Sequence, residues 1–528
     1  MKKMILLLIM LLISTPLHAE EGWFPYYFPS DPAKAPDYRG VPPSAFNAGK
    51  DVLDAPAGKH GFVKVKNGHF YFEDGTRARF WGTNLCFSAC FPPTRKQAEI
   101  LANRIAYFGF NSVRLHHMDY KFEPTGIFED IAPAYKDNQM KPTGHLSRRQ
   151  LDRLDYLIYQ LKQRGIYINI NTLVSRRFTE AEGIKDAEAL GMAAKPVSLF
   201  DPKLIELQKQ YAKDLLTHYN PYTKLRYCDD PAVCLVEITN ENTLTECDPA
   251  KLPEFYQREL KALTDNGKIP PAELEKKYLT EMRAYLIETV GIKVPIGIGG
   301  DGNQTQLTIQ RECLDYIDKH GYWDHPSFPN KSWDMNDFRM HNKSMLADKN
   351  LGIIGESKKT RAFVNPTLRE AKSANVLVAD GAAKQSVPFV VSEWNHCYPN
   401  PYAYETPMLL ASTARQEDWD ALFQFAFAHS WDIENSFDDI HSFFDINSNA
   451  QQLILCSYAS RIFLGDVIAR NEVTKQSIPA FEIKDDYTTI NYAGYSIKAG
   501  EIKNTGSGWD SKGRFNWGTL PTLMKDYD

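Results

Sequence analysis

Two apolar runs in the sequence each lead to a glutamate. "VCLVEITNEN" (233–242) ends on Asn240, Glu241 and Asn242, and "PFVVSEWN" (388–395) carries Glu393 near its end. Burying a carboxylate in a strand is costly unless the group is paired or used for chemistry. Two carboxylates from separate strands suit glycoside hydrolysis, in which retaining enzymes place them about 5 Å apart. We therefore take Glu241 and Glu393 as the candidate catalytic pair.

Such a pair works only if its two carboxyl groups have different pKa values. A cation and a phenol beside the nucleophile would keep it ionised, and Arg114 in "SVRLHH" and Tyr322 in "KHGYW" stand at the ends of other predicted strands. Partial burial and the neighbouring negative charge would raise the pKa of the acid. The sequence thus predicts that one of the two glutamates is the acid and the other the nucleophile.

A repeating pattern of strands and helices would position these residues. Such alternation is typical of βαβ units and a parallel sheet. We count eight strands over about 76–462, which predicts an α/β fold, a (β/α)8 TIM barrel with its active site at the carboxyl ends of the strands. A doubly wound sheet is the alternative, but no Gly-rich phosphate loop opens a strand-to-helix turn. The strands are predicted within 79–84, 111–117, 166–171, 233–242, 294–300, 313–323, 388–395 and 422–432.

Two smaller segments flank the predicted barrel. Residues 20–75 are expected to form an N-terminal wrapping segment with a β-hairpin, since Asn67-Gly68 and Asp74-Gly75 are strong hairpin signals. Residues 463–528 contain a stretch that alternates at period two, which predicts a small C-terminal β appendage followed by an irregular tail.

The N-terminus has the pattern of a signal peptide. Lys2 and Lys3 precede an apolar run from Met4 to Ile13, and small residues lead to a cleavage site near Ala19. The run is too short to span a bilayer. The sequence therefore predicts residues 1–19 as a signal peptide and a secreted or periplasmic mature chain without membrane insertion.

Composition limits the classes of partner. The 528 residues are 43% hydrophobic and 24% charged, with a formal charge of -5. That charge gives no electrostatic reason to expect nucleic acid or an anionic membrane as partner. The eight cysteines lack the spacing of a metal site, so we predict no metal and mostly free, buried thiols with at most one disulfide. The oligomeric state stays open.

The motifs around the two glutamates resemble those of a known group of enzymes. The region 76–462 is similar to the clan of retaining glycoside hydrolases typified by family 5, the cellulase-like enzymes. "TNEN" (239–242) matches the Asn-Glu pair that ends strand four in that clan, and "SEWN" (392–395) matches the glutamate that ends strand seven. The resemblance implies that Glu241 is the acid/base and Glu393 the nucleophile, and it implies no cofactor.

The resemblance also assigns the surrounding residues. Asn240 would bind the sugar 2-hydroxyl, Arg114 and Tyr322 would position Glu393, His320 would belong to a His-x-Tyr motif, and Trp431 would form the floor of the -1 subsite. One departure is the missing histidine at the end of strand three, where "NINTLVSRR" offers only Asn171, Thr172 or Arg176 as substitutes.

Other polar and aromatic residues have two interpretations. Adjacent strand residues point to opposite faces, so we expect His116 to face substrate and His117 to pack, rather than both to bind a metal. Trp394 is predicted as a subsite wall, because aromatic faces stack on sugar rings. Glu237 lies deeper in its strand, and we expect it to pair with an arginine.

The sequence as a whole favours a secreted retaining β-glycoside hydrolase acting on a β-linked oligo- or polysaccharide. A non-catalytic carbohydrate-binding barrel and a metal-dependent hydrolase using His116 or His117 are the alternatives. A transglycosylase would use the same residues. Fold and motif predict the chemistry but do not name the sugar.

Overall fold

A computed structural model of the chain shows the barrel strands close to their predicted positions. They are β3 (Phe80–Cys86), β4 (Ser112–His116), β5 (Tyr167–Asn171), β8 (Val233–Asn240), β9 (Ile296–Gly299), β10 (Ile317–Asp318) continued by β11 (Gly321–Trp323), β12 (Phe389–His396) and β13 (Ala421–Ala428). The structure describes residues 28–35, 42–130, 142–191, 194–300, 304–333, 338–340, 387–416, 418–431, 442–465, 490–492 and 495–497.

These strands form one parallel sheet in the order β10-β12-β13-β3-β4-β5-β8-β9, with β11 also paired to β12. Backbone hydrogen bonds join the two ends of this order: Asp315 donates to Ile296 at 3.0 Å, and His320 donates to Gly300 at 2.6 Å. The sheet is therefore a closed or nearly closed barrel, and the predicted (β/α)8 TIM fold is confirmed.

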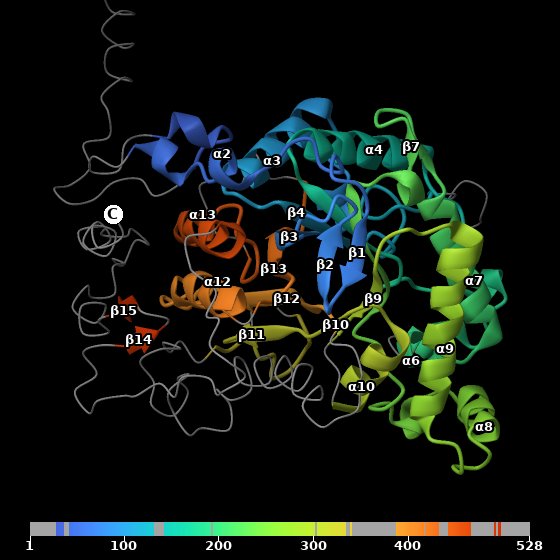
Figure 1. Cartoon of the computed structure of the whole chain (residues 1–528). Coiled ribbons are helices and arrows are strands. Elements are labelled where there is room, and N and C mark those ends of the chain that lie inside the picture. Colours follow the sequence, from blue (N-terminus) through green and yellow to red (C-terminus); the bar gives the residue numbers. More distant parts are fainter. Residues whose placement is uncertain are drawn as a thin grey trace, which may run out of the picture.

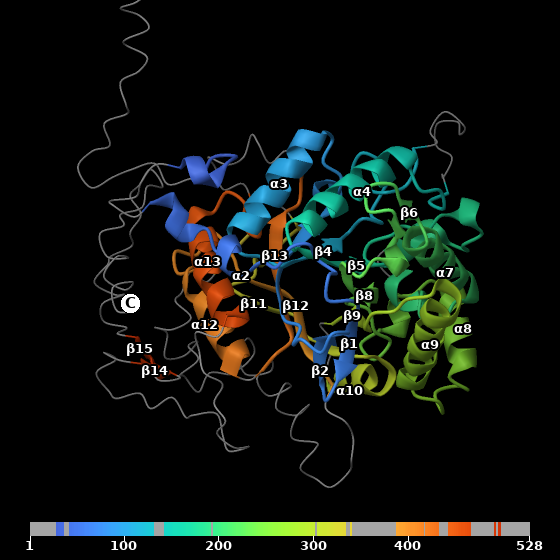
Figure 2. The same ribbon diagram turned by 45° about the horizontal axis from the view of Figure 1, so that its top comes forward.

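Helices surround the strands on the outside (Figures 1 and 2). Four of the described helices begin at a side-chain cap that accepts a hydrogen bond from a backbone N–H of the first turn: Thr94, Ser147, Asp201 and Asn449. Such caps satisfy donors that a helix start leaves free. The longer helices are α3 (Arg95–Tyr107), α4 (Arg148–Gln163), α7 (Pro202–Leu216), α8 (Glu254–Leu263), α9 (Pro271–Tyr285), α10 (Gln304–Cys313), α12 (Glu405–Gln416) and α13 (Ala450–Leu464).

Shorter elements connect the main ones. The short helices are α2 (Gly49–Val52), α5 (Ala187–Leu190) and α6 (Ala194–Val197), with a π-helical turn η9 (Leu286–Val290) after α9. The 3-10 turns are η1 (Pro32–Lys34), η2 (Pro43–Phe46), η3 (Phe87–Cys90), η5 (Glu180–Glu182), η7 (Tyr227–Asp229) and η8 (Pro249–Lys251), and β6 (Tyr219–Asn220) pairs with β7 (Leu225–Arg226).

The predicted N-terminal hairpin closes the amino-terminal end of the barrel. β1 (Val63–Lys66) and β2 (His69–Phe72) pair antiparallel around Asn67 and Gly68, both with positive φ, which suits a tight hairpin turn. Phe70 of β2 is fully buried, and its ring meets Tyr316, just before β10, at 5.8 Å between centroids. The hairpin thus fills the end of the barrel opposite the catalytic candidates.

The remaining predictions about the flanks have mixed outcomes. At the C-terminus, β14 (Ile490–Tyr492) and β15 (Tyr495–Ile497) form an antiparallel pair, and the rest of 466–528 lies outside the described residues, as does the predicted signal peptide.

All eight cysteines are free and six are buried, so no disulfide is formed. None of the described helices is long and apolar enough to cross a membrane.

Candidate active site

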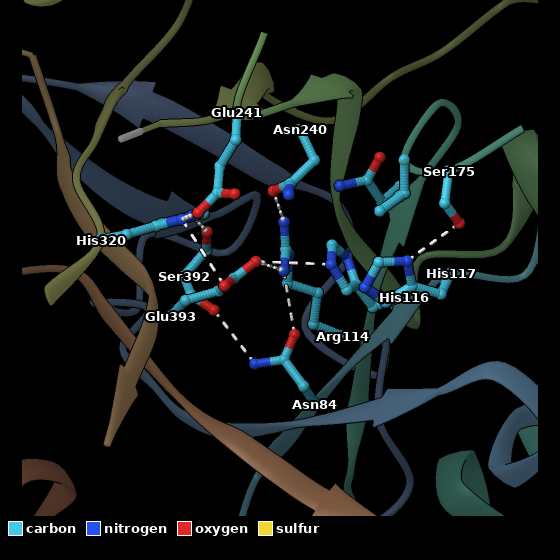
Figure 3. A network of polar contacts seen from close by, with 12 residues as sticks. Asn84, Arg114, His116, His117, Ser175, Asn240, Glu241, His320, Ser392 and Glu393 are labelled. Carbon is cyan, nitrogen blue, oxygen red and sulfur yellow. Dashed lines mark hydrogen bonds and ion pairs between the residues drawn. The ribbon is translucent and has the colours of Figure 1, made fainter. Parts of the chain in front are cut away.

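The carboxyl ends of the barrel strands bring the two candidate glutamates together. Glu393 lies in β12, and Glu241 directly follows β8 (Figure 3). One carboxylate oxygen of each lies, with one ring nitrogen of His320, in a group whose atoms are all within 4.8 Å of one another. The Glu393 side chain is 6% exposed and the Glu241 side chain 38%. Glu393 is therefore enclosed, whereas Glu241 borders the opening.

Two donors orient the Glu393 carboxylate. Arg114 Nη1 donates to its Oε1 at 3.0 Å, and the Tyr322 hydroxyl donates to its Oε2 at 2.6 Å. Burial and the Glu393 charge raise the pKa of Tyr322 well above its ordinary value, so the phenol keeps the proton that it donates. The sequence analysis expected Arg114 and Tyr322 to position Glu393, and both side chains contact its carboxylate.

Arg114 lies at the centre of this buried network. It is fully buried and donates to Glu237 through Nε and Nη2, the latter at 2.7 Å, and to Asn84 Oδ1 at 3.0 Å. Burial alone would lower the pKa of Arg114, but the charges of Glu237 and Glu393 raise it, so the guanidinium stays charged. Glu237 is thus the buried partner of an arginine, as predicted from its depth in the strand.

The orientation of Asn240 follows from its contact with Arg114. Arg114 Nη2 lies 2.7 Å from Asn240 Oδ1, and because a guanidinium only donates, the amide oxygen must face it. The amide nitrogen of Asn240 is then directed elsewhere as a donor. Gly299 makes room for this arrangement, since a Cβ at that position would overlap Asn240 Oδ1 and Arg114 Nη2.

The pKa of the Glu241 carboxyl group differs from the predicted one. Its φ of 44° is left-handed, which is uncommon for a non-glycine residue. His320 Nδ1 lies 2.7 Å from Glu241 Oε1. Burial alone would raise the pKa of Glu241, but the hydrogen bond and charge of His320, with the charges of Lys195 and Arg114, lower it to about 2. The predicted rise was wrong because His320 and the nearby cations outweigh the effect of burial.

The adjacent histidines of β4 have separate environments. His116 Nε2 lies 3.4 Å from Glu393 Oε1, and its buried Nδ1 has no hydrogen-bond partner among the described residues. Burial and the Arg114 charge lower the pKa of His116 well below its ordinary value, so the ring is neutral. His117 bonds Ser175 Oγ at 2.9 Å and stacks on Phe87 at 4.3 Å. Only His116 therefore borders the carboxylate pair.

The missing strand-three histidine is not replaced from its own strand. Asn171 donates to the Glu237 carboxylate at 2.7 Å, and Thr172 donates to the Glu237 carbonyl at 3.0 Å. Arg176 forms an ion pair at 2.8 Å with a carboxylate of the following turn. Besides His320, an imidazole beside Glu393 comes from His116, at the end of the neighbouring strand β4.

Trp394 does not line the site, which corrects its predicted role. It is 1% exposed and packs against Trp81 with ring centroids 5.5 Å apart, within the main core. Side chains alternate along a strand, so Trp394 points outward toward the helices where Glu393 points inward. A residue in this position has no contact with substrate.

The predicted floor residue, Trp431, lies three residues beyond the end of β13 and is half-buried. Its contact with a sugar stays a prediction. An aromatic residue without a sequence signal borders the site: Phe425 of β13 meets the rings of Tyr322 at 6.1 Å and His116 at 5.8 Å. Phe425 lies within an apolar strand pattern and so carried no signal of its own.

The site does not fit a metal centre. Glu241, His320 and Glu393 offer three possible ligand atoms. However, both oxygens of Glu393 already accept hydrogen bonds. The positive Arg114 guanidinium would also repel a cation placed among these three ligand atoms. His117, proposed as a ligand in the metal-dependent alternative, bonds Ser175 instead.

Comparisons with known proteins find a curated relative and several solved structures that are similar to the chain. No family description matches the chain. A curated plant protein, mannan endo-1,4-beta-mannosidase 7 from Arabidopsis thaliana, is 26% identical over 210 residues, which is 38% of this chain and 43% of that protein. The chain therefore spans less than half the length of this relative.

Solved structures similar to the chain have low sequence identity to it. The endo-1,4-beta-mannanase of Rhizomucor miehei has a TM-score of 0.48 and 15% identity, covering 76% of this chain and 99% of that one. The endo-beta-1,4-mannanase of Thermotoga petrophila has a TM-score of 0.45 and 14% identity, covering 74% and 78%. The activity therefore has to be argued from the site itself.

Proposed function

We propose that the chain is a glycosidase that cleaves a β-linked oligo- or polysaccharide with retention of configuration. The observation that carries the proposal is the carboxylate pair of Glu241 and Glu393, with oxygens within 4.8 Å at one end of the barrel. Retaining enzymes use a separation near 5 Å, whereas inverting enzymes need about 6.5–9.5 Å to admit a water.

The two carboxylates take different roles because their surroundings differ. Glu393, enclosed and held by Arg114 and Tyr322, attacks the anomeric carbon and forms a glycosyl ester. Glu241 is more exposed and next to His320, whose raised pKa keeps a proton there, and this proton passes through Glu241 to the leaving oxygen. Water then enters beside Glu241, gives up a proton and releases the sugar from Glu393, so configuration is retained.

Neighbouring groups are placed to bind the sugar of the ester. The Asn240 amide nitrogen is free of Arg114 and available to the 2-hydroxyl, and the unpartnered Nδ1 of buried His116 needs a hydrogen-bonding group. Phe87 and His117 both have left-handed backbone, with φ of 49° and 55°, and their rings stack nearly parallel. Strain of this kind is concentrated at functional sites.

Mannan is the first substrate to test, because the relatives named above are mannanases. We expect release of reducing sugar from a panel of β-1,4-mannan, carboxymethylcellulose, xylan and β-1,3-glucan by the wild type but not by Glu393→Ala. Glu254→Ala, at an exposed helix position, is the matched control and should keep full activity. A first-formed product anomer of inverted configuration, measured by NMR, would contradict the proposal.

The alternatives make different predictions in the same assay. A non-catalytic carbohydrate-binding barrel would bind one of the polysaccharides without releasing sugar. A metal-dependent hydrolase would lose activity in excess EDTA, whereas we expect none to be lost. A transglycosylase would produce oligosaccharides longer than the substrate supplied, which chromatography of the products detects.

We further propose that the protein is exported and matures by cleavage near Ala19, on the evidence of its N-terminal sequence pattern. Expression of the full chain in a bacterial host, followed by mass measurement of the periplasmic or secreted product, tests this. The expected product begins at Glu20. A product that keeps the first 19 residues would contradict the proposal.

A further inference from the structure

The left-handed backbone of Glu241 needs support from its surroundings. Its φ is 44°, and a strained conformation of this kind persists only where neighbouring groups hold it. The Glu241 N–H donates to the Gly299 carbonyl at 2.7 Å, on the β9 side. On the other side, Lys195 Nζ donates to the Asn240 carbonyl at 2.9 Å. The peptide group that joins Asn240 to Glu241 is therefore held at both of its polar atoms.

Lys195 takes the place of a backbone donor in the sheet. The Asn240 N–H donates to the Leu173 carbonyl at 2.9 Å, so in a continued parallel ladder the Asn240 carbonyl would accept from the Ser175 N–H. That N–H donates instead to Asp119 Oδ1 at 3.1 Å. The ladder between β5 and β8 therefore ends here, and the Lys195 ammonium group donates to the carbonyl in place of the backbone.

The short helix α6, which carries Lys195, is also fixed to the residue that follows Glu241. Ser198, directly after α6, donates to the Lys195 carbonyl at 2.6 Å and accepts from Asn242 Nδ2 at 3.2 Å. Gln208 of α7 donates to the Ser198 carbonyl at 2.8 Å. Ser198, Asn242 and Gln208 are all buried. One segment thus contacts the residues on both sides of Glu241.

A neutral donor would be enough to satisfy a carbonyl, but Lys195 also brings a positive charge. Among the described residues, no carboxylate forms an ion pair with its ammonium group, and the side chain is half-buried. Burial raises the pKa of Glu241, whereas His320 lowers it and the charge of Lys195 lowers it further. The same charge acts on the rings of His116 and His117. Lys195 is therefore a cation of the active site.

We propose that Lys195 is a positioning residue for the acid/base Glu241: its ammonium group fixes the Asn240–Glu241 peptide, and its charge makes the Glu241–His320 pair release the catalytic proton more readily. The proposal rests on the glycosidase function argued above. In the first step that proton goes to the leaving oxygen as its bond to the anomeric carbon breaks and the bond to Glu393 forms. In the second step water loses a proton to the Glu241–His320 pair as its oxygen replaces Glu393.

Other charged or titratable groups also face the Glu241 carboxylate. Among the described residues these include His320, Glu393, Arg114, Tyr322 and His117. Burial raises the pKa of Tyr322 and lowers that of His117, so both rings are neutral. The cations His320 and Arg114 are hydrogen-bonded to the catalytic carboxylates, whereas Lys195 is bonded to a backbone carbonyl. A substitution therefore removes the charge of Lys195 without breaking a hydrogen bond of Glu241 or Glu393.

The sign of the pH dependence follows from these charges. Burial alone would lower the pKa of His320, but Glu393, Asp318 and Glu241 raise it well above its ordinary value. The Glu241–His320 pair therefore keeps its proton through neutral pH and loses it as the pH rises through that pKa, which sets the basic limb of activity. A nearby positive charge opposes protonation, so without Lys195 the basic limb of kcat/KM should move to higher pH, by about half a unit to one unit.

The kinetic test uses the full chain on the polysaccharide that the wild type cleaves, and it separates the charge from the hydrogen bond. Lys195→Met removes both, so kcat should fall about tenfold or more, with KM changed less than about threefold and the basic limb moved to higher pH. Lys195→Gln keeps a donor and should show the same displacement of the limb with a smaller loss of kcat. Lys195→Arg keeps charge and donor and should retain the wild-type limb. Ser198→Ala loosens α6 at constant charge, so kcat should fall about twofold to fivefold on an unmoved limb.

Lys64→Met is the matched control. Lys64 Nζ also donates to a backbone carbonyl at 2.9 Å, that of Lys293, but at the amino-terminal end of the barrel. Its kcat and its pH profile should equal those of the wild type. A basic limb that stays in place in both Lys195→Met and Lys195→Gln, or that moves to lower pH, would overturn the proposal.

A second measurement needs no substrate. In protein labelled with ¹³C at the glutamate carboxyl carbons, the Glu241 signal is the one that Glu241→Gln removes. We expect its titration midpoint to be higher in Lys195→Met than in the wild type, and unchanged in Lys195→Arg and Lys64→Met. Equal midpoints in Lys195→Met and the wild type would contradict the proposed effect of the charge. If no sugar is released but the midpoint moves as expected, the glycosidase function fails and the action of Lys195 on Glu241 stands.

Discussion

The barrel carries a buried ionic network at each end, and the two networks differ in what their central carboxylate contacts. At the amino-terminal end, Asp420 is 1% exposed and accepts backbone hydrogen bonds from Phe70 at 2.9 Å and Phe389 at 3.0 Å. Arg77 Nη2 pairs with the same carboxylate at 2.8 Å. These partners come from the hairpin, from β12 and from the segment between β2 and β3, and Asp420 itself lies just before β13, so the network joins the hairpin to the barrel.

At the carboxyl-terminal end, similar residues leave bonding positions open. The buried Nδ1 of His116 has no partner among the described residues, and Glu241 is more than one-third exposed. Left-handed backbone occurs at both ends, but at the amino-terminal end it falls on Asp418, a type that tolerates it. At the carboxyl-terminal end, which we call the mouth, the left-handed backbone falls on Phe87, His117 and Glu241. In residues of these types this backbone conformation has a higher free energy.

The comparison shows that a buried carboxylate by itself does not mark an active site. Asp420 and Glu393 are both buried and both contact an arginine. Asp420 accepts from backbone groups of two elements, whereas Glu393 accepts from the side chains of Arg114 and Tyr322 and has a second carboxylate, that of Glu241, within 4.8 Å. Two carboxylates close together, combined with backbone strain, identify the end at which a ligand binds.

The largest expected effect is at the mouth. Glu393→Gln should reduce kcat by about 10⁴-fold or more, because the neutral amide cannot attack the anomeric carbon. The thermal midpoint of unfolding should change little, since Arg114 keeps Glu237 as a charged partner. Initial rates and calorimetry on the same preparations measure both. Substantial residual activity in a well-folded variant would remove Glu393 from the mechanism.

The next effect tests the residue that connects site and core. Glu237→Ala leaves Arg114 buried without its main partner and should lower the free energy of unfolding by about 3–5 kcal/mol. Activity should fall as well, because Arg114 would no longer hold Glu393 and Asn240 in place. Urea unfolding followed by fluorescence gives the stability change. A variant that loses activity at unchanged stability would make Glu237 part of the chemistry and not of the support.

At the amino-terminal end, stability and activity should separate. Asp420→Asn removes a charge that accepts from Arg77 and two backbone groups, so the free energy of unfolding should fall by about 1.5–3 kcal/mol. At temperatures where the variant stays folded, kcat/KM should remain within about twofold of the wild type. A large loss of kcat/KM in the folded variant would show that the two networks are coupled through the barrel.

Much of the mouth could be predicted from the sequence because its signals are local. Alternating strands and helices gave the barrel, and polar residues at strand ends gave Glu241, Glu393 and Arg114. Depth within one strand separated Glu237 from Glu241. Each of these inferences needs only the periodicity of a single segment and the rule that barrel sites lie at the carboxyl ends of strands.

The charge state of Glu241 could not be predicted in this way. It depends on His320, 79 residues further along the chain, and on Ser392 and Asp318 behind that ring. The β12–β13 pairing shifts register between Val391 and Trp394. This irregularity lets Ser392 and Glu393, although adjacent, both face the barrel interior, which a strict alternation along the strand does not allow.

The smallest expected effects distinguish the two aromatic residues. Trp394→Phe changes the packing against Trp81 and should lower the free energy of unfolding by about 1–3 kcal/mol with kcat/KM within about twofold. Phe425→Ala removes a ring that borders Tyr322 and His116, and should raise KM about two- to tenfold through lost contact with the sugar. Steady-state kinetics on both variants, beside their melting curves, gives the comparison. A kinetic effect of Trp394→Phe larger than that of Phe425→Ala would restore Trp394 to the subsite and would mean that β12 turns its other face to the substrate.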